Sequence, residues 1–262
     1  MIILNMAFVV FLLGLCCGSF VNMLIFRTAV AYKLKSPIRR KRTPPLTRGN
    51  FLGSRSVCDF CGKQLNWFDN IPVISWLWLK GKSRCCGKKL PVLYPIVEIA
   101  TGLLFLLNFQ FSIFDFQSIF VYLILIFLMF SAVFDFKYMI LPDFSTVILI
   151  LLSLVFIKNI NNVYCAFGAS GFLYLLYLIT KGRGMGLGDV KYAVFMGLFL
   201  GWPKTLIAFY IAFIIGAIVG VILMILKKKQ FRSEIAFGPF LILGTILAWW
   251  WGEAIIEYIM TI

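Results

Sequence analysis

The sequence predicts an all-α polytopic membrane protein, with about eight transmembrane helices and a basic, cysteine-containing domain between the first two. Three observations support this prediction. Of the 262 residues, 62% are hydrophobic and only 13% are charged, whereas a soluble domain is about half apolar. The apolar residues gather into eight runs, most of which have the roughly 17–25 residues that cross a bilayer. The basic residues collect in alternate loops between these runs.

Residues 1–26 form the first apolar run. No basic residues precede it and no cleavage site of the A-x-A kind follows it, so we expect a retained helix rather than a signal peptide. Gly14, Gly18 and Ser19 are small residues suited to close helix packing. Asn22 is the polar exception, and an interhelical hydrogen bond is its simplest explanation.

Residues 27–90 are predicted to form a domain outside the bilayer. They hold 15 Lys or Arg residues and several prolines. The basic run at 39–42 is typical of a cytoplasmic flank that touches anionic lipid, and attraction of an acidic partner is the alternative. The formal net charge of +15 therefore follows membrane topology and does not indicate a nucleic-acid partner.

Two cysteine pairs lie in this domain. Cys58 and Cys61 have the C-x-x-C spacing of zinc ligands, and Cys85 and Cys86 follow about 25 residues later. Each pair is followed by Gly-Lys, and this repeat suggests two knuckles around one structural Zn²⁺. The second pair is irregular, because C-x-x-C spacing would require a cysteine where the chain has Ser83. Either Cys85 substitutes for it, or the zinc site is weak or absent. A disulfide is less favoured in a reducing cytosol.

Residues 91–262 are predicted to form a seven-helix membrane domain. Its apolar runs span about 91–111, 117–135, 142–158, 162–180, 188–202, 204–226 and 236–259. With 27–90 in the cytoplasm, 23 of the 25 basic residues lie on the cytoplasmic side, as the positive-inside rule requires. Both termini are then expected outside the cytoplasm. Asp135, Asp143 and Asp189 all fall on its cytoplasmic side.

The absence of histidine restricts the chemistry of this chain. Ser-His-Asp and Cys-His hydrolases and H-E-x-x-H zinc proteases are excluded. Acid–base work must fall to carboxylates, Lys, Tyr or Cys. Six of the ten acidic residues belong to loops or lie near the ends of the last helix, and four remain as candidates in or beside apolar helices: Glu98, Asp135, Asp143 and Asp189.

Asp135 and Asp189 are the candidates for a proteolytic pair. Two neighbouring carboxyls in low dielectric share one proton, so that one activates water while the other polarises the scissile carbonyl. Gly186 and Gly188 precede Asp189, and their backbone groups are expected to pair with an extended substrate.

Each acidic residue also has a simpler structural explanation. Asp189 is a possible N-cap of the following helix. Asp135 is a possible ion-pair partner of Lys137, at the boundary of its helix. Asp143 follows a proline and is expected to cap the next helix. Glu98 is either a packed, protonated carboxyl or the binding group for a substrate amine.

The motifs taken together are more specific than any one of them. Gly186-Leu-Gly-Asp189 resembles the G-x-G-D motif of intramembrane aspartyl proteases, and Asp135 with Pro142-Asp143 resembles the first aspartate motif of bacterial type IV prepilin peptidases. Further matches to the prepilin peptidases cover nearly the whole chain. They are Gly18-Ser-Phe-Val-Asn22 with Arg27, Cys58-x-x-Cys61, the run from Trp67 to Trp76, Tyr94-Pro-Ile-Val-Glu98 with Thr101-Gly102, and Gly184 to Lys191.

The resemblance implies a membrane aspartyl endopeptidase of the bacterial inner membrane. Such enzymes cut the basic leader from type IV prepilin or pseudopilin precursors, after a glycine, at the cytoplasmic face. Proteolysis needs no cofactor, and many members also methylate the new N-terminus with S-adenosyl-L-methionine. By carry-over, residues 91–262 form the peptidase domain and residues 27–90 belong to the methylating region. Members with this region usually carry two complete C-x-x-C pairs, from which Ser83 departs.

The resemblance also assigns roles to individual residues. The catalytic residues would be Asp135 and Asp189. The residues that support them or bind substrate would be Gly186, Gly188, Asp143, Lys191 and Glu98.

Two other functions agree with parts of the sequence. A proton-coupled transporter would use the same carboxylates as proton carriers. No internal repeat is evident and no carboxylate lies at mid-membrane, and both observations count against it. A non-catalytic subunit of a secretion complex, carrying a zinc knuckle, is the other alternative.

Overall fold

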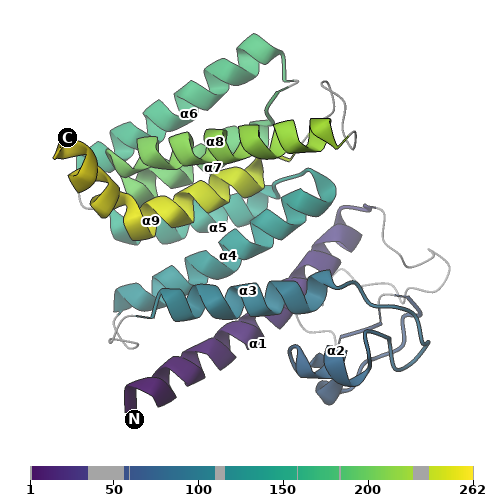
Figure 1. Ribbon diagram of the computed structural model, residues 1–262. Helices are drawn as coiled ribbons and strands as arrows, with labels where there is room; N and C mark the ends of the chain where they lie inside the picture. Colours follow the sequence, from purple (N-terminus) through teal and green to yellow (C-terminus); the bar gives the residue numbers. More distant parts are fainter. Residues whose placement is uncertain are drawn as a thin grey trace. The chain divides into compact units, whose positions relative to one another are not determined.

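The computed structural model describes residues 2–34, 56–58, 60–109, 116–157, 159–182, 184–226 and 236–261. The basic run at 39–42 and the basic loop at 227–232 lie outside these residues. The described parts are helical, apart from turns and two isolated β-bridges (Figure 1). The helices are α1 (Ile2–Ala31), η1 (Trp67–Asn70), α2 (Ile74–Trp78), α3 (Leu93–Leu107), α4 (Phe116–Tyr138), α5 (Asp143–Ser153), η2 (Leu154–Phe156), α6 (Ile160–Thr180), α7 (Leu187–Leu200), α8 (Lys204–Ile225) and α9 (Gly238–Met260).

The predicted all-α membrane fold is confirmed. Each of the eight apolar runs corresponds to one α-helix, α1 and α3 to α9. By length and composition, five described helices can cross a membrane: α1, α4, α6, α8 and α9. The other three, α3, α5 and α7, have 15, 11 and 14 residues. At about 1.5 Å per residue, none of these three alone spans a hydrocarbon core about 30 Å thick.

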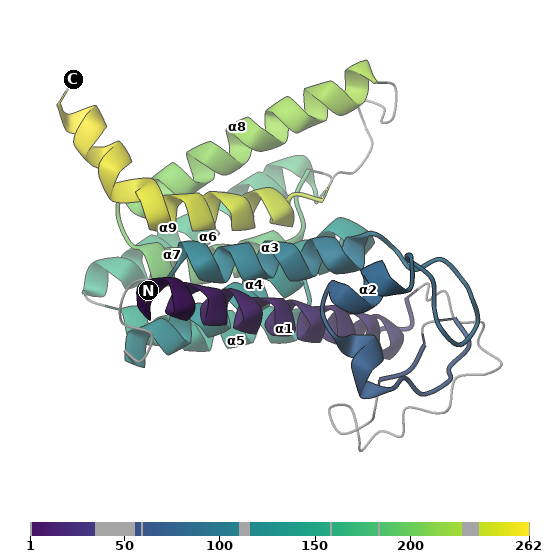
Figure 2. The same ribbon diagram turned by 60° about the horizontal axis from the view of Figure 1, so that its bottom comes forward.

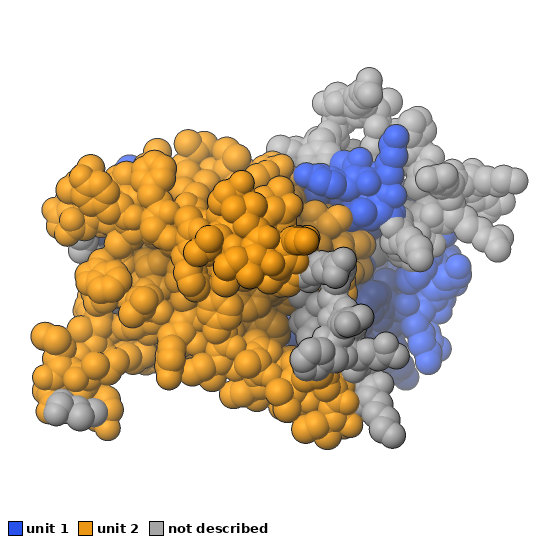
Figure 3. Space-filling model, turned by 90° about the horizontal axis from the view of Figure 1, so that it is seen from above, with its two compact units in different colours: residues 1–130 blue, residues 131–262 orange. Residues whose placement is uncertain are grey.

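The chain divides into two compact units, residues 1–130 and 131–262 (Figure 3). The boundary falls within α4, so that its last turns, from Ser131 onward, belong to the second unit. The functional division at 90/91 stays a prediction.

In the first unit, α1 and α3 pack closely through glycine. A Cβ atom added at Gly14 would lie 2.7 Å from the Cα of Gly102, and one added at Gly18 would lie 2.6 Å from the Cα of Glu98. These positions therefore require glycine, as the sequence analysis predicted for close helix packing. The predicted interhelical hydrogen bond of Asn22 is also confirmed, because its Nδ2 donates to the carbonyl of Tyr94 at 3.1 Å.

In the second unit, α7 is the most enclosed helix. It contacts α5, α6, α8 and α9 (Figures 1 and 2). Tyr192, Phe195 and Met196 are fully buried on it, and the Tyr192 hydroxyl donates to Thr245 Oγ1 of α9 at 3.2 Å. A helix surrounded by other helices need not match the bilayer thickness, which explains why α7 can be short.

A tight turn at residues 139–142 joins α4 to α5. Met139 has φ of 55°, in the left-handed region, and its N–H donates to the carbonyl of Asp135 at 2.7 Å. Ser131 Oγ donates to Ser145 Oγ at 3.0 Å and joins the two helices beyond the turn. The end of α4, which carries Asp135, is therefore fixed against the start of α5.

Candidate active site and cysteine cluster

Asp189 lies in the first turn of α7. Its side chain is held there by the helix start, because Gly186 N–H donates to Asp189 Oδ2 at 3.0 Å. The simpler explanation expected Asp189 to be the N-cap of this helix. The N-cap is instead Gly186, and Asp189 caps the helix start from the third helical position. The bond engages one carboxyl oxygen, and the residue is only 7% exposed. Capping and a chemical role are therefore compatible.

Asp135 lies in the last turn of α4 and is 5% exposed. Its carboxylate accepts a hydrogen bond from the backbone N–H of Gly238, the first residue of α9. The ion pair with Lys137 is not formed, since the Lys137 ammonium lies instead 5.2 Å from the Tyr138 ring centroid. Each aspartate is therefore held by a helix N-terminus, whose free N–H groups favour negative charge.

Leu141 connects the surroundings of the two aspartates. A Cβ at Gly188 would lie 3.0 Å from Leu141 Cβ, and a Cβ at Gly238 would lie 3.2 Å from Leu141 Cδ1. Leu141 is itself buried, in the turn between α4 and α5. The carboxylates of Asp135 and Asp189 are close enough to interact electrostatically. Two acids 54 residues apart in the chain are thus gathered at helix ends (α4, α7 and α9) around one leucine.

Asp143 and Lys191 form an ion pair beside these helix ends. Lys191 Nζ lies 2.7 Å from Asp143 Oδ1, and both side chains are more than half exposed. Asp143 begins α5 but its side chain makes no capping hydrogen bond, so the capping role expected for it is not observed. The pair joins the start of α5 to the first turns of α7.

The glycines before Asp189 have more definite roles than the sequence suggested. The N–H of Gly186 already donates to Asp189, and its carbonyl accepts the Asp189 N–H at 3.2 Å and keeps a second lone pair. Gly188 lies within α7 and allows Leu141 to approach. Both residues therefore shape the aspartate site from within.

Gly238 is a site residue that the sequence analysis missed. A Cβ there would lie 2.6 Å from Asp135 Oδ2, a separation that real Cβ atoms do not show. The available signal was Gly238-Pro239 at the start of the last apolar run, since proline in the first turn marks a helix start. Nothing in the sequence linked that start to Asp135.

Glu98 belongs to the first compact unit, whereas Asp135 and Asp189 belong to the second. It is 7% exposed and accepts the backbone N–H of Val73 at 2.7 Å. Asn22 of α1 also hydrogen-bonds to its carboxylate, and Ser19 of α1 lies beside it. Glu98 therefore joins α1, α3 and the segment before α2.

The two cysteine turns have the same backbone structure, displaced by 25 residues. Cys58 N–H donates to the carbonyl of Lys63 at 2.8 Å, and Ser83 N–H donates to that of Lys88 at 2.8 Å. The bridge from Val57 to Gln64 has its counterpart in the second turn. Ser83 therefore occupies the position of Cys58, which confirms that a serine stands where the repeat requires a cysteine.

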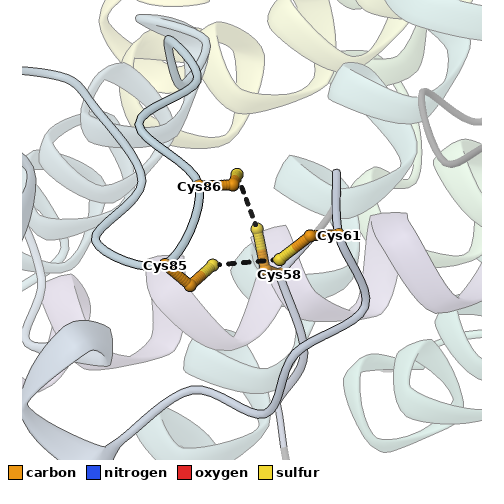
Figure 4. Close-up of side chains that lie close together, drawn as sticks. All are labelled: Cys58, Cys61, Cys85 and Cys86. Atoms are coloured by element: carbon orange, nitrogen blue, oxygen red, sulfur yellow. Dashed lines mark hydrogen bonds between the residues drawn. The ribbon is translucent and has the colours of Figure 1, made fainter.

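Cys85 supplies the fourth sulfur in place of residue 83. The Sγ atoms of Cys58, Cys61, Cys85 and Cys86 all lie within 4.8 Å of one another (Figure 4). The Cys58–Cys86 separation is 3.8 Å and the Cys61–Cys85 separation is 3.1 Å. Tetrahedral zinc with Zn–S bonds of about 2.3 Å places its sulfurs about 3.8 Å apart. The four cysteines fit a zinc ion without substantial rearrangement.

Ser83 lies within the cysteine cluster although it supplies no sulfur. Its Oγ lies 3.2 Å from the sulfurs of both Cys58 and Cys85. Burial raises the pKa of the Cys58 thiol, but hydrogen bonds from Ser83 and from the N–H groups of Phe60 and Cys61 to the thiolate lower it to about 7. Burial, together with the charge at Cys58, raises the pKa of Cys85 to about 12. A cation would favour both thiolates, because metal binding displaces their protons.

Two family models match the chain. The Bacterial Peptidase A24 N-terminal domain matches residues 12–111, which include the cysteines and Glu98, and the Type IV leader peptidase family matches residues 119–221, which include both aspartates. Gly238 lies beyond the second match.

Curated relatives match over most of the chain. A prepilin leader peptidase/N-methyltransferase of Pectobacterium carotovorum is 32% identical, over 89% of this chain and 89% of its own length. The protein of that name from Aeromonas salmonicida is 32% identical, over 96% and 93%. The one from Pseudomonas aeruginosa is 31% identical, over 93% and 90%. No solved structure matches the chain.

Proposed function

Because this chain belongs to the type IV leader peptidase family, and is therefore a membrane peptidase that processes prepilins, we propose that Asp135 and Asp189 form its catalytic pair. The observation that supports this assignment most directly is their joint burial at helix ends that share Leu141. Both residues lie within the part matched by the peptidase family model. Two carboxyls that share one proton in this way would titrate as a pair rather than as separate residues.

The pair would divide the chemistry of hydrolysis. The ionised carboxylate takes a proton from water, whose oxygen attacks the scissile carbonyl carbon. The protonated carboxyl donates its proton to the carbonyl oxygen and so stabilises the tetrahedral intermediate. Collapse breaks the C–N bond, and the amine leaves with the proton taken from water. The helix starts that hold the aspartates supply a preorganised field in place of bulk solvent.

The remaining predicted residues support this pair. Gly186 orients Asp189 through the bond from its N–H, and Gly188 admits Leu141 beside it. The Asp143–Lys191 ion pair fixes the start of α5 to α7 at the rim of the site. We assign all four a positioning role.

We propose that the cut takes place at the cytoplasmic face of the bacterial inner membrane. Alternation of the apolar runs puts the site aspartates on the side that carries nearly all basic residues. The substrates would be type IV prepilins or pseudopilins whose apolar helix stays in the bilayer while the basic leader is removed after glycine. Cleavage itself requires no cofactor.

We propose N-methylation of the new N-terminus as a second activity. It is supported by the names of the relatives and by the match of residues 12–111 to the N-terminal domain model. S-adenosyl-L-methionine, when bound, supplies the methyl group for the freed amine. Among the described residues of this region, Glu98 is a buried carboxylate, and we propose that it holds that amine.

Zinc at Cys58, Cys61, Cys85 and Cys86 is proposed as a structural element of that region. The sulfur separations fit tetrahedral coordination, and four thiolates form a closed site with no position open for catalysis. The metal would clamp the two turns together.

Cleavage of a prepilin by purified enzyme tests the catalytic pair. Asp135→Asn and Asp189→Asn should each lower kcat/KM by about 10³-fold or more, because neither amide can exchange a proton with its partner. Asp143→Asn, at the rim, is the matched control and should retain most activity. Product masses read at both ends give the cut position, and normal cleavage by either aspartate variant would refute the assignment.

The methyl group is tested separately. Mass spectrometry of the cleaved product, made with and without S-adenosyl-L-methionine, should show a gain of one methyl group only when the donor is present. Glu98→Gln should lose this gain and still cleave. Neither the transporter nor the non-catalytic subunit is supported, since the family matches indicate a peptidase.

A further inference from the structure

Residues 67–78, which comprise η1, α2 and the turn between them, carry a group of exposed apolar side chains. Trp67 is 80% exposed, Trp78 is 82% exposed, and Ile74 and Leu77 are about 60% exposed. Ile74, Leu77 and Trp78 are spaced three and four residues apart, which places them on one face of α2. We call these four residues the interfacial patch. Such a group in water would be unfavourable by several kcal/mol, at roughly 25 cal/mol per Å² of apolar area.

The segment is attached to two apolar helices at defined points. Ser19 Oγ of α1 donates to the carbonyl of Asn70 at 3.4 Å, and Val73 N–H donates to Glu98 of α3 at 2.7 Å. Figure 2 shows α2 beside the later part of α1 and the start of α3. The level of residues 67–78 along the membrane normal is therefore set by Ser19 and Glu98.

The position of residues 67–78 along the membrane normal falls within the membrane interface and not in the bulk cytosol. Ser19 precedes Arg27 by eight residues of continuous helix, or about 12 Å of rise. The headgroup layer on one side of a bilayer is only about 5–7 Å thick. Even with Arg27 at its outer edge, Ser19 reaches the hydrocarbon boundary. The interfacial patch thus lies where Trp side chains are enriched in membrane proteins.

The charges around the patch match anionic lipid. Exposed basic residues follow it closely, and the acidic Asp69 beside it is already paired with Arg84 at 2.8 Å. Besides the paired Arg84, the exposed basic residues are Lys80, Lys82, Lys88 and Lys89. A basic prepilin leader would be repelled by this surface, whereas anionic headgroups are attracted to it.

We propose that residues 67–78 form an interfacial anchor, which inserts the patch among the headgroups of the cytoplasmic leaflet and places the following lysines against anionic lipid. The anchor holds the cysteine turns on the membrane surface, since the ring of Trp76, a residue of α2, packs against Gly81, just before the second turn. The interfacial patch would thus contact the same bilayer that α1 crosses. This inference does not depend on which residues perform the cleavage.

Photo-crosslinking of the full chain tests the anchor. p-Benzoylphenylalanine is placed at position 67 or, separately, at position 78, and the protein is reconstituted in nanodiscs of phosphatidylethanolamine and phosphatidylglycerol. Both positions are more than three-quarters exposed, so the substitution should leave folding intact, and prepilin cleavage verifies this. Gln64, an exposed polar residue of the first cysteine turn, is the control position.

We expect intact-mass shifts of one phospholipid at positions 67 and 78, several-fold more frequent than at 64, and fewer when phosphatidylglycerol is replaced by phosphatidylcholine. Equal lipid labelling at all three positions, or none, would overturn the anchor. The same irradiation with added prepilin distinguishes the other occupants. Adducts mainly to the precursor would make the patch a substrate surface, and adducts to a second copy would make it an interface between chains; either result contradicts the proposal.

Discussion

The aspartate site and the cysteine cluster are built in contrasting ways. Asp135 and Asp189 are at most 7% exposed and are held by the ends of helices distant in sequence. The four cysteines lie on two short turns that repeat after 25 residues, and three of them are partly exposed. The first site depends on packing across a whole unit. The second depends on local backbone geometry, so that a sulfur from Cys85 can replace one expected at position 83.

The packing of the aspartate site should make it intolerant of a single added methyl group. We expect Gly238→Ala to lower kcat/KM for prepilin cleavage by about 10²-fold or more, because the new Cβ would displace the Asp135 carboxylate, and misplacement of about 1 Å has that effect. Steady-state cleavage of a purified precursor measures this change.

A matched control separates this effect from the general effect of a Gly→Ala substitution in a helix. Gly171→Ala, in α6, places a methyl group where no atom lies within 4 Å, and should leave cleavage and thermal stability almost unchanged. If Gly238→Ala cleaves at the wild-type rate while remaining folded, the close approach of α9 to Asp135 is not part of the active structure.

The cysteine cluster, in contrast, should still bind zinc when one cysteine is moved from position 85 to position 83. Wild-type protein is expected to bind one zinc per chain, and Cys58→Ser and Cys85→Ser should each lose it, while Cys165→Ser in α6 retains it. Because the two turns are equivalent, the double variant Ser83→Cys/Cys85→Ser should recover the metal. Elemental analysis of purified protein measures each content.

Cleavage supplies the second readout for the cluster. All of these cysteine variants should cleave prepilin within a few-fold of the wild type, because the aspartates belong to the other compact unit. Zinc retained in Cys85→Ser but absent from the double variant would show that the equivalence of Ser83 and Cys58 has no bearing on the metal.

A change of pH should affect the two sites differently. The proposed mechanism needs one proton on the aspartate pair. We therefore expect kcat/KM to fall about tenfold per pH unit both below the first ionisation, where both carboxyls are protonated, and above the second, where both are charged. Zinc content should fall only on the acid side, where protons compete for the thiolates. A cleavage profile with a single limb would contradict the shared proton.

The sequence predicted the cysteine cluster in more detail than the aspartate site, because it shows local patterns but not contacts between distant segments. The apolar runs and the C-x-x-C spacing are local patterns, so the eight helices and the cysteine turns could be located, including the irregular position of Ser83. The pairing of Asp135 with Asp189 followed from topology and from resemblance to a family. Contacts between distant segments leave no local pattern, so Gly238, Leu141 and the Asp143–Lys191 pair could not be derived.

The smallest effect is expected at the rim of the aspartate site. Lys191 and Asp143 lie 2.7 Å apart, but their side chains are 53% and 66% exposed, so their coupling should be below about 1 kcal/mol, or about five-fold in kcat/KM. A double-mutant cycle with Lys191→Gln and Asp143→Asn measures it, and added salt should reduce it further. Lys204–Glu253 is a comparison pair of the same length, 2.7 Å, near the other end of α9, although Lys204 is only 18% exposed, and Lys204→Gln should not alter cleavage. If Lys191→Gln lowers cleavage far more than Asp143→Asn does, Lys191 acts on the substrate directly. The ion pair would then be its resting position, and the rim of the aspartate site would be part of substrate recognition rather than of its support.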